Sequence, residues 1–276
     1  MKEEKGVSRL TEVLFLLLLP YLVTMLLNGT ECALLNYKFD WEIALPLLVS
    51  SQISAEYDSE AIKCQAVIAR TNFYRKWKES GNLWEILNDM KKTIKFTKYQ
   101  DFFIEDIYRK AVEETKGFVL LYEGEWKLVP YHLCSNGKTR SGEEVFHDKT
   151  YQYLQSVESK QDKQADIYMN HIYIPESQMP QTFEILQRDS FGYVMNVSTD
   201  ARMQEAETFR KQMGLPSADF YVKKTGSFCL FLCRGSGHGL GFSQYGGSAL
   251  GEQGKEWKEI LSIYFPLMEI KKVDRI

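Results

Sequence analysis

The sequence lacks the cysteine pattern of a disulfide framework and the charge of a nucleic-acid-binding protein. Its five cysteines are an odd number without a CxxC pair, so at most two disulfides can form and no four-thiolate zinc site is present. Its 34 basic side chains are balanced by 37 acidic ones, which leaves a net charge of -3. We therefore expect no nucleic acid among its partners.

Linker-forming residues are also scarce, because the chain has only seven prolines, and no internal repeat is present. Apolar residues make up 44% of the chain and aromatic residues 13%. This composition is sufficient to bury a sizeable core and argues against disorder. We expect one large domain and a terminal segment.

An almost unbroken apolar run, Val13–Leu27, follows Lys2, Lys5 and Arg9 near the N-terminus. A helix of this run rises about 22 Å, less than the roughly 30 Å of a bilayer core, so it either recruits flanking residues to span or serves as a signal-peptide core. The preceding basic residues predict a cytoplasmic N-terminus. We prefer an uncleaved anchor over a cleaved signal or a buried core helix. Residues 1–32 are then the cytoplasmic tail and anchor, and residues 33–276 form a domain outside the cell membrane.

The most strongly predicted helix begins after Asp58 and ends at Gly81. Asp is a favoured N-capping residue, and the sequence between these positions contains no Gly or Pro. An apolar stripe at helical spacing is formed by Ile62, Ala66, Ala69 and Phe73. This stripe is predicted to face the core.

A second stripe on the same helix carries Glu60, Lys63, Arg70 and Tyr74. These side chains could line a groove together. The alternative is a solvated face on which Glu60 and Lys63 form an ion pair.

The remaining pattern mixes helices and strands irregularly. Residues 82–115 are predicted to be mostly helical, and residues 204–213 form a helix that Gly214 ends. A hairpin is predicted for 118–122 and 126–134, and further strands are predicted at 153–157, 182–186, 193–198, 220–223 and 227–233. We therefore predict an α+β fold: a single mixed α/β domain with antiparallel strands and a long N-terminal helix, preceded by the membrane-targeting helix.

The densest glycine cluster surrounds a histidine between Cys233 and Gly254. Glycines alternate on both sides of His238, so the backbone can approach a ligand or another strand closely. The segment lacks the lysine and hydroxyl pair of a P-loop, which argues against nucleotide binding. His238 is either accessible to a groove or a turn histidine of the core.

A second polar cluster spans Tyr131–Thr139. His132 and Cys134 are two residues apart, so on a strand they point to one face, as two zinc ligands would. His147 or His171 could supply a third ligand. Zinc is thus the one candidate cofactor, and a structural pair without metal is the alternative.

Five fragments in this order resemble one protein family. They are SAEYDSEAIKCQAVIARTNFY from Ser54, AVEETKGFVLLY from Ala111, YHLCSNGKT from Tyr131, AETFRKQMGL from Ala206 and GSGHGLGFSQYGGSALGEQGKEWKEILSIYFP from Gly235. Together they are similar to the domain of stage II sporulation protein D and the amidase enhancers of bacterial cell walls. The resemblance covers about residues 39–270.

The resemblance implies a lytic transglycosylase that cuts peptidoglycan glycan strands from which an amidase has removed the stem peptides. In the sporulating members this occurs during engulfment of the forespore. An acid protonates the glycosidic oxygen, and the muramoyl 6-hydroxyl closes on C1 to give a 1,6-anhydro product. The implied partners are peptidoglycan strands, a cell-wall amidase and membrane proteins of sporulation.

The sequence departs from the family at the acid. The family acid aligns eight residues before Glu60, at Gln52, and an amide cannot deliver a proton. Glu56 and Glu60 are the candidate replacements, although a carboxylate displaced by a turn of chain seldom reaches the same oxygen. The resemblance implies substrate-binding roles for Gln52, Lys63, Arg70, Ser135, Thr139, His238, Ser243, Gln244 and Tyr245.

Two functions follow from these residues. One is a membrane-anchored lytic transglycosylase with a relocated acid, and the other is a glycan-binding module or amidase enhancer that has lost its acid. Both require a trough with the long helix as its floor and the glycine-rich segment as its roof. We therefore expect Arg70 and His238 to share one cleft.

Overall fold

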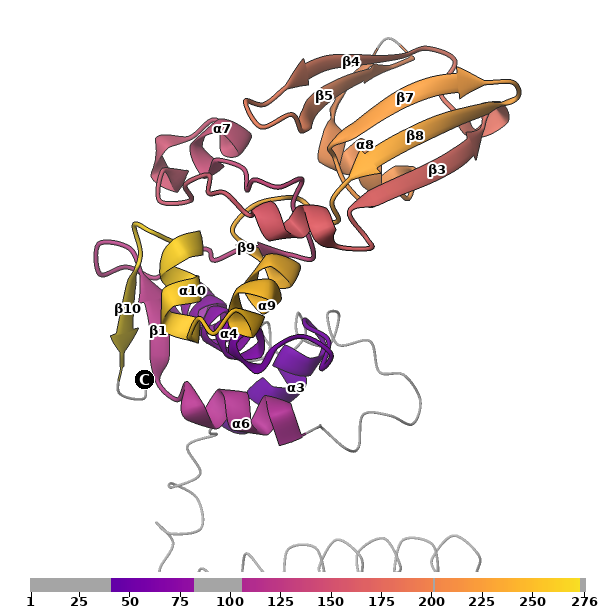
Figure 1. The fold of residues 1–276 in the computed structure, drawn as a ribbon. Helices are drawn as coiled ribbons and strands as arrows, with labels where there is room; N and C mark the ends of the chain where they lie inside the picture. Colours follow the sequence, from indigo (N-terminus) through magenta and orange to yellow (C-terminus); the bar gives the residue numbers. More distant parts are fainter. Residues whose placement is uncertain (1–40, 82–105, 201, 274–276) are drawn as a thin grey trace, which may run out of the picture. The chain divides into compact units, whose positions relative to one another are not determined.

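The computed structural model describes residues 41–81, 106–200 and 202–273 (Figure 1). Residues Leu45–Ile276 form one compact unit. The apolar run Val13–Leu27, the predicted boundary at residues 32 and 33, and most of the predicted helical region 82–115 lie outside the described residues. Within the described ranges, no helix is both long and apolar enough to cross a membrane, and the anchor stays a prediction.

The described residues form both helices and short sheets, which are antiparallel except for the parallel β2–β9 pair. The helices are η1 Trp41–Ile43, α3 Leu45–Ser50, α4 Ser59–Ser80, α6 Asp106–Glu114, α7 Gly142–Phe146, η2 Lys149–Tyr151, η3 Lys160–Gln164, η4 Glu176–Gln178, α8 Ala206–Gln212, α9 Gln244–Glu252 and α10 Trp257–Tyr264. The strands are β1 Phe118–Leu121, β2 Tyr131–His132, β3 Met169–Pro175, β4 Phe183–Arg188, β5 Val194–Thr199, β6 Arg202–Glu205, β7 Phe220–Thr225, β8 Phe228–Arg234, β9 Phe242–Ser243 and β10 Glu269–Lys272. The predicted α+β class with antiparallel strands is confirmed.

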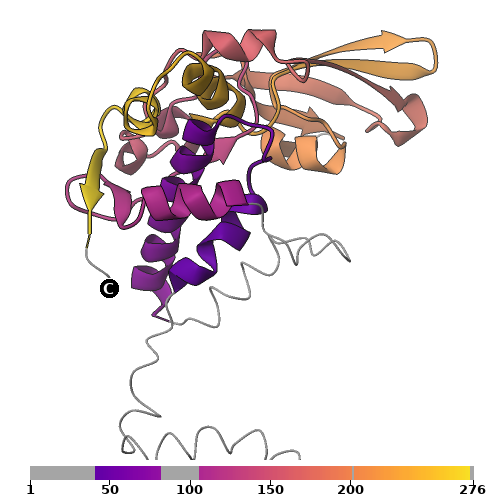
Figure 2. The same ribbon diagram turned by 60° about the horizontal axis from the view of Figure 1, so that its bottom comes forward.

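Helix α4 is the centre of the helical part of this unit, where it contacts α3, α6, α9, α10 and β1 (Figures 1 and 2). Its predicted ends are confirmed, because the Asp58 side chain accepts from the Glu60 N–H at the start and Gly81, with φ of 60°, ends the helix. The predicted core stripe is also confirmed. Its members Ile62, Ala66, Ala69 and Phe73 are all buried.

The hairpin predicted for residues 118–134 does not form as a pair of strands. Strand β1 pairs instead with β10, and only the single bridge between Tyr122 and Glu125 closes the turn. The following residue, Trp126, packs its ring 5.1 Å from that of Tyr74 on α4. Burial of this indole draws the chain away from β1, and the next strand, β2, pairs in parallel with β9.

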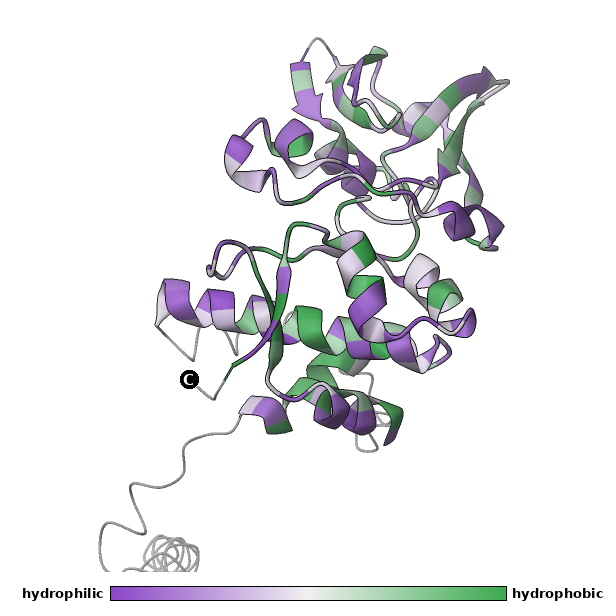
Figure 3. Cartoon of the chain, turned by 60° about the vertical axis from the view of Figure 1, so that its left-hand side comes forward, coloured by the Kyte–Doolittle hydropathy of each residue, from purple (hydrophilic) through white to green (hydrophobic). Residues whose placement is uncertain are grey.

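Two three-stranded antiparallel sheets, β3-β8-β7 and β4-β5-β6, share a core with α8. Phe209, Phe220 and Phe231 are at most 1% exposed and form its centre. Hydrophobic and hydrophilic residues both occur in these sheets (Figure 3), and in β8 the buried Phe231 and Cys233 alternate with half-buried residues, as a strand with one buried face requires. The strands predicted near β4, β5, β7 and β8 and the helix ended by Gly214 are confirmed.

The strand predicted at 153–157 is wrong. Tyr153 is buried in a turn, where its hydroxyl donates to the Leu128 carbonyl oxygen over 2.9 Å. The Val157 carbonyl accepts from the Thr139 N–H over 2.9 Å. The strand-forming residues at 153–157 therefore have other roles here. Tyr153 buries its ring, and Val157 holds the Tyr131–Thr139 segment through the hydrogen bond to Thr139.

Candidate functional site

Three glutamine side chains from separate segments meet just after α3. Gln244 Nε2 donates to the backbone oxygen of Gln52 over 2.7 Å and to Gln65 Oε1 over 3.1 Å. Gln65 Nε2 in turn donates to Gln52 Oε1 over 2.7 Å. The structure thus brings together the predicted site residues Gln52 and Gln244. It adds Gln65, which is 0% exposed; its sequence signal was an amide directly before the apolar stretch AVIA of α4.

An open cleft of about 340 Å³ adjoins these glutamines along the chain. It is lined by the α3–α4 loop, the segment before β3 and α9. The lining residues are Ser54, Glu56, Tyr57, Asp166, Ile167, Tyr245, Ser248, Ala249 and Glu252. Glu56 is exposed there, so one of the two candidate acids, together with the predicted ligand contact Tyr245, faces a space that can admit a ligand.

The two tyrosines give the cleft an aromatic and hydrogen-bonding character. Burial raises the pKa of Tyr57, and burial followed by the charges of Glu252 and Asp166 raises the pKa of Tyr245. Both phenols therefore stay protonated at neutral pH and can donate or accept hydrogen bonds. Rings with a polar tip beside carboxylates suit a sugar, which presents apolar faces and hydroxyl groups.

Close packing of α9 against the N-terminus of α4 holds this cleft. The Asp58 N–H donates to Ser248 Oγ over 2.8 Å. A Cβ at Gly251 would lie only 2.1 Å from the Asp58 carboxylate, so glycine is needed for the approach. Three glycines of the GGSALGEQG sequence, Gly246, Gly247 and Gly251, therefore serve helix packing in this structure.

The second candidate acid, Glu60, is occupied by other contacts. One of its oxygens accepts from Lys63 Nζ over 2.6 Å, and the other accepts the Trp257 N–H at the start of α10 over 2.8 Å. Lys63 also pairs with Glu114 over 2.6 Å. Both residues hold helices together, as in the ion-pair alternative, and neither lines the cleft.

Arg70 does not line an open groove, which corrects its predicted role. Its side chain is 0% exposed, and its guanidinium donates to the carbonyl oxygens of Val112 and Phe118, each over 3.2 Å. The last carbonyl groups of α6 have no partner within the helix and need such donors. Tyr74, which completes the predicted groove stripe, is 4% exposed.

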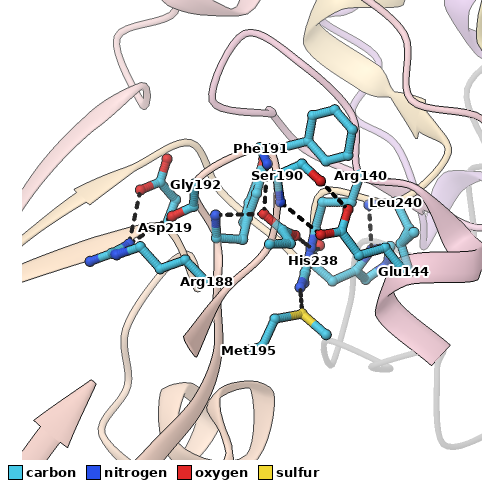
Figure 4. A network of polar contacts seen from close by, with 12 residues as sticks. Arg140, Glu144, Arg188, Ser190, Phe191, Gly192, Met195, Asp219, His238 and Leu240 are labelled. Carbon is cyan, nitrogen blue, oxygen red and sulfur yellow. Dashed lines mark hydrogen bonds and ion pairs between the residues drawn. The ribbon is translucent and has the colours of Figure 1, made fainter. Parts of the chain in front are cut away.

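His238 is half-buried and does not line the cleft either. Its Nδ1 accepts from the Leu240 N–H over 3.1 Å, and its carbonyl accepts from Arg140 over 3.3 Å. Arg140 forms a buried ion pair of 2.6 Å with Asp189 in the network of Figure 4. Burial and then His132 lower the pKa of His238 to about 3, so its ring is neutral at pH 7. The predicted trough shared by Arg70 and His238 is therefore wrong, and the functional interpretation rests on the cleft beside Gln52.

A buried carboxylate explains the serines of the two polar motifs. Asp162 accepts from the backbone N–H of Ser135 and from Ser243 Oγ, each over 2.8 Å. Ser135, Ser243 and Thr139 are all 0% exposed, so burial corrects their predicted contact with glycan. Burial raises the pKa of Asp162, although these hydrogen bonds oppose the shift. Sequence reasoning missed Asp162 because it lies in the polar stretch KQDKQ, which reads as solvent-exposed.

The residues predicted to bind zinc do not fit a metal site. Among the described residues, no three His, Cys, Asp or Glu side chains converge to hold an ion. Nδ1 of His132 lies 3.0 Å from the Leu240 carbonyl oxygen. The Cys134 thiol donates to the Asp162 carbonyl oxygen, and burial raises its pKa, which opposes the thiolate that zinc requires. We derive no step through a metal.

Comparisons with known proteins find relatives of the kind that the motifs indicated. The profile of the family described as Stage II sporulation protein matches residues 34–122. The chain is 27% identical over 259 residues to stage II sporulation protein D of Bacillus amyloliquefaciens, with 82% of this chain and 73% of the relative covered. It is 26% identical to stage II sporulation protein D of Bacillus subtilis, with the same coverage. The amidase enhancer of Bacillus subtilis is 23% identical over 79% of this chain and 39% of that protein. The chain is thus similar to stage II sporulation protein D and to an amidase enhancer.

Proposed function

We propose that this protein acts in the bacterial cell wall and binds the glycan strands of peptidoglycan in the cleft beside Tyr57 and Tyr245. The observation that carries the proposal is the opening of Glu56 and Tyr245, from two separate motifs of the chain, onto one space of about 340 Å³. The names of its relatives, which refer to sporulation and to an amidase, support a cell-wall role. Export behind the apolar run Val13–Leu27 is part of this proposal, as is a cell-wall amidase as partner.

Cleavage by this site would use Glu56 as the single acid. Its carboxylic proton passes to the glycosidic oxygen, the bond from that oxygen to C1 breaks, and the 6-hydroxyl oxygen of the same muramoyl residue bonds to C1. The hydroxyl proton then returns to the Glu56 carboxylate, so that the acid is regenerated. Glu56 is favoured over Glu60 because the oxygens of Glu60 are held by Lys63 and by the Trp257 N–H.

A glycan-binding module without cleavage is the second candidate, and Gln52 favours it. The position that aligns with the family acid carries an amide whose oxygen is held by Gln65. In this case the protein would hold denuded strands or stimulate an amidase. The cleft serves both candidates, and only the fate of the glycosidic bond distinguishes them.

Digestion of sacculi by the full-length chain tests both candidates. We expect binding to amidase-treated sacculi, and mass spectrometry of the soluble products reports anhydro-muropeptides if cleavage occurs. Glu56→Gln should then lower their rate of formation by about 10²- to 10⁴-fold, whereas the exposed matched variant Glu79→Gln should not.

Each outcome has a separate meaning. An unchanged rate in Glu56→Gln would remove the assigned acid, and a lack of anhydro products with binding retained would select the binding module. If Gln52→Glu then gained turnover, the lost-acid explanation would be supported. If neither intact nor denuded sacculi were bound, the proposed function would fail in both forms.

A further inference from the structure

The direction of the glutamine hydrogen bonds is fixed by a backbone carbonyl. The Gln244 atom that lies 2.7 Å from the Gln52 backbone oxygen must be nitrogen, because a carbonyl oxygen only accepts. The same nitrogen lies 3.1 Å from an atom of the Gln65 amide, which must then be oxygen. The other terminal atom of Gln65 is its nitrogen, and 2.7 Å from it lies the side-chain oxygen of Gln52.

In the amide of Gln52, the oxygen is therefore the atom held by Gln65, and the NH₂ group is the one left for another partner. Gln65 and Gln244 are 0% and 1% exposed, so neither can rotate its amide into water. Rotation of both amides would place the Gln244 oxygen against the Gln52 backbone oxygen, and the lost hydrogen bond would be replaced by repulsion. Gln52 itself is half-buried. Within the part of the chain that the structure describes, no acceptor lies within hydrogen-bonding distance of its Nε2.

The neighbouring cleft offers hydrogen-bond acceptors, whereas Gln52 offers a donor. Glu56, Asp166 and Glu252 line it with carboxylates, which accept hydrogen bonds from sugar hydroxyl groups but repel a carbonyl oxygen. Gln52 lies two residues before Ser54, and Gln244 immediately precedes Tyr245; both Ser54 and Tyr245 line the cleft. Both glutamines are thus within two residues of the cleft lining, and the donor of Gln52 is close along the chain to a site rich in acceptors.

We propose that Gln52 donates a hydrogen bond to the acetamido carbonyl oxygen of an N-acetylated sugar bound in this cleft. The inference rests on the proposed function and adds the feature of the sugar that is recognised. Gln52 then determines specificity for N-acetylated sugars, and its amide group binds the sugar. Sugars without an acetamido group would lose this contact.

Nuclear magnetic resonance of the glutamine side-chain amides tests the contact directly. The full-length chain is labelled with ¹⁵N in its glutamine side chains, and the Gln52 pair is identified by its absence from the Gln52→Glu spectrum. We expect chitotetraose, a tetramer of N-acetylglucosamine, to shift the Gln52 pair on titration. Cellotetraose, which lacks acetamido groups, should leave this pair in place.

Binding constants for the same probe provide the second measurement. Gln52→Met keeps the length of the side chain and removes the donor, so it should weaken chitotetraose binding by roughly five- to tenfold. Gln253→Met makes the same exchange at an exposed position outside the glutamine network and should bind like the unaltered chain.

The outcomes separate this inference from the proposed function. If chitotetraose bound without moving the Gln52 pair, and Gln52→Met bound it with unchanged affinity, the inference would be overturned while the proposed function stood. If sacculi were bound but chitotetraose was not, recognition of the acetamido group at this site would also be refuted. If neither were bound, both proposals would fall.

Discussion

At the scale of single residues, His132 links the stability of the fold to pH. Its side chain is 4% exposed, and burial lowers its pKa from 6.5 to about 4. Between these values the unfolded chain binds more protons than the folded one. The free energy of unfolding therefore increases as the pH rises and decreases as the pH falls. We expect a loss of about 2 kcal/mol from this residue between pH 7 and pH 5, measured by urea unfolding at both pH values.

Two variants isolate this contribution. His132→Gln should reduce the loss of stability between pH 7 and pH 5 by about half, because glutamine does not titrate whereas His238, whose pKa is also lowered, still does. His171→Gln alters an exposed histidine on β3 and should leave the dependence intact. A slope that His132→Gln does not change would show that other groups cause the acid sensitivity.

At the scale of elements, α9 packs through its glycines, and this packing opposes helix propensity. A Cβ at Gly246 would lie 2.2 Å from Tyr264 Oη and 2.3 Å from Ser159 Oγ, and both atoms belong to buried residues. Gly246→Ala should therefore lower the free energy of unfolding by about 1–3 kcal/mol through overpacking, although alanine favours a helix over glycine by about 1 kcal/mol. Urea unfolding measures the change.

The reverse exchange on the same helix serves as the control. Ala249 is half-buried, so Ala249→Gly should cost only the propensity difference of about 1 kcal/mol. Stabilisation by Gly246→Ala would contradict the packing of α9 against α10 and η3. The position of Tyr245 in the cleft depends on that packing.

At the scale of the whole molecule, the apolar run Val13–Leu27 is predicted to hold the protein in the cell membrane. We expect the full-length chain to sediment with membranes, to resist extraction by salt and to be released by detergent, because an apolar helix leaves the bilayer only when another apolar phase replaces it. Protease added to intact protoplasts should digest the domain after residue 33. Recovery of the chain from the soluble fraction, or protection from the protease, would contradict the anchored and exported state.

A chain that lacks residues 13–27 supplies the matched control. It should remain in the cytoplasm and be protected from added protease. The folded unit 45–276 contains none of the deleted residues, so a change of fraction would report on targeting. Equal fractionation of both chains would remove the role assigned to the apolar run.

The sequence by itself determined the features that depend on local chemistry. The Asp58 cap, the Gly81 end and the buried stripe of α4 follow from residue types at fixed spacing, and strands β4, β5, β7 and β8 follow from runs of strand-forming residues. The order of the motifs indicated the family. Local rules suffice here because each of these features is decided by residues within a few positions of one another.

Only the tertiary structure decided which polar side chains meet a ligand and which are buried. Arg70, Ser135 and Thr139 looked like binding residues, yet their partners lie inside the fold. Arg70 donates to a carbonyl oxygen, Ser135 donates to the buried Asp162 carboxylate, and Thr139 Oγ1 accepts from the Val157 N–H. Glu56 and Tyr245 line one cleft although 189 positions separate them in the sequence. The sequence shows that a side chain is charged or polar, but it does not show whether water, a ligand or the protein itself forms its hydrogen bonds. Its partners come from distant segments, and only packing brings those segments together.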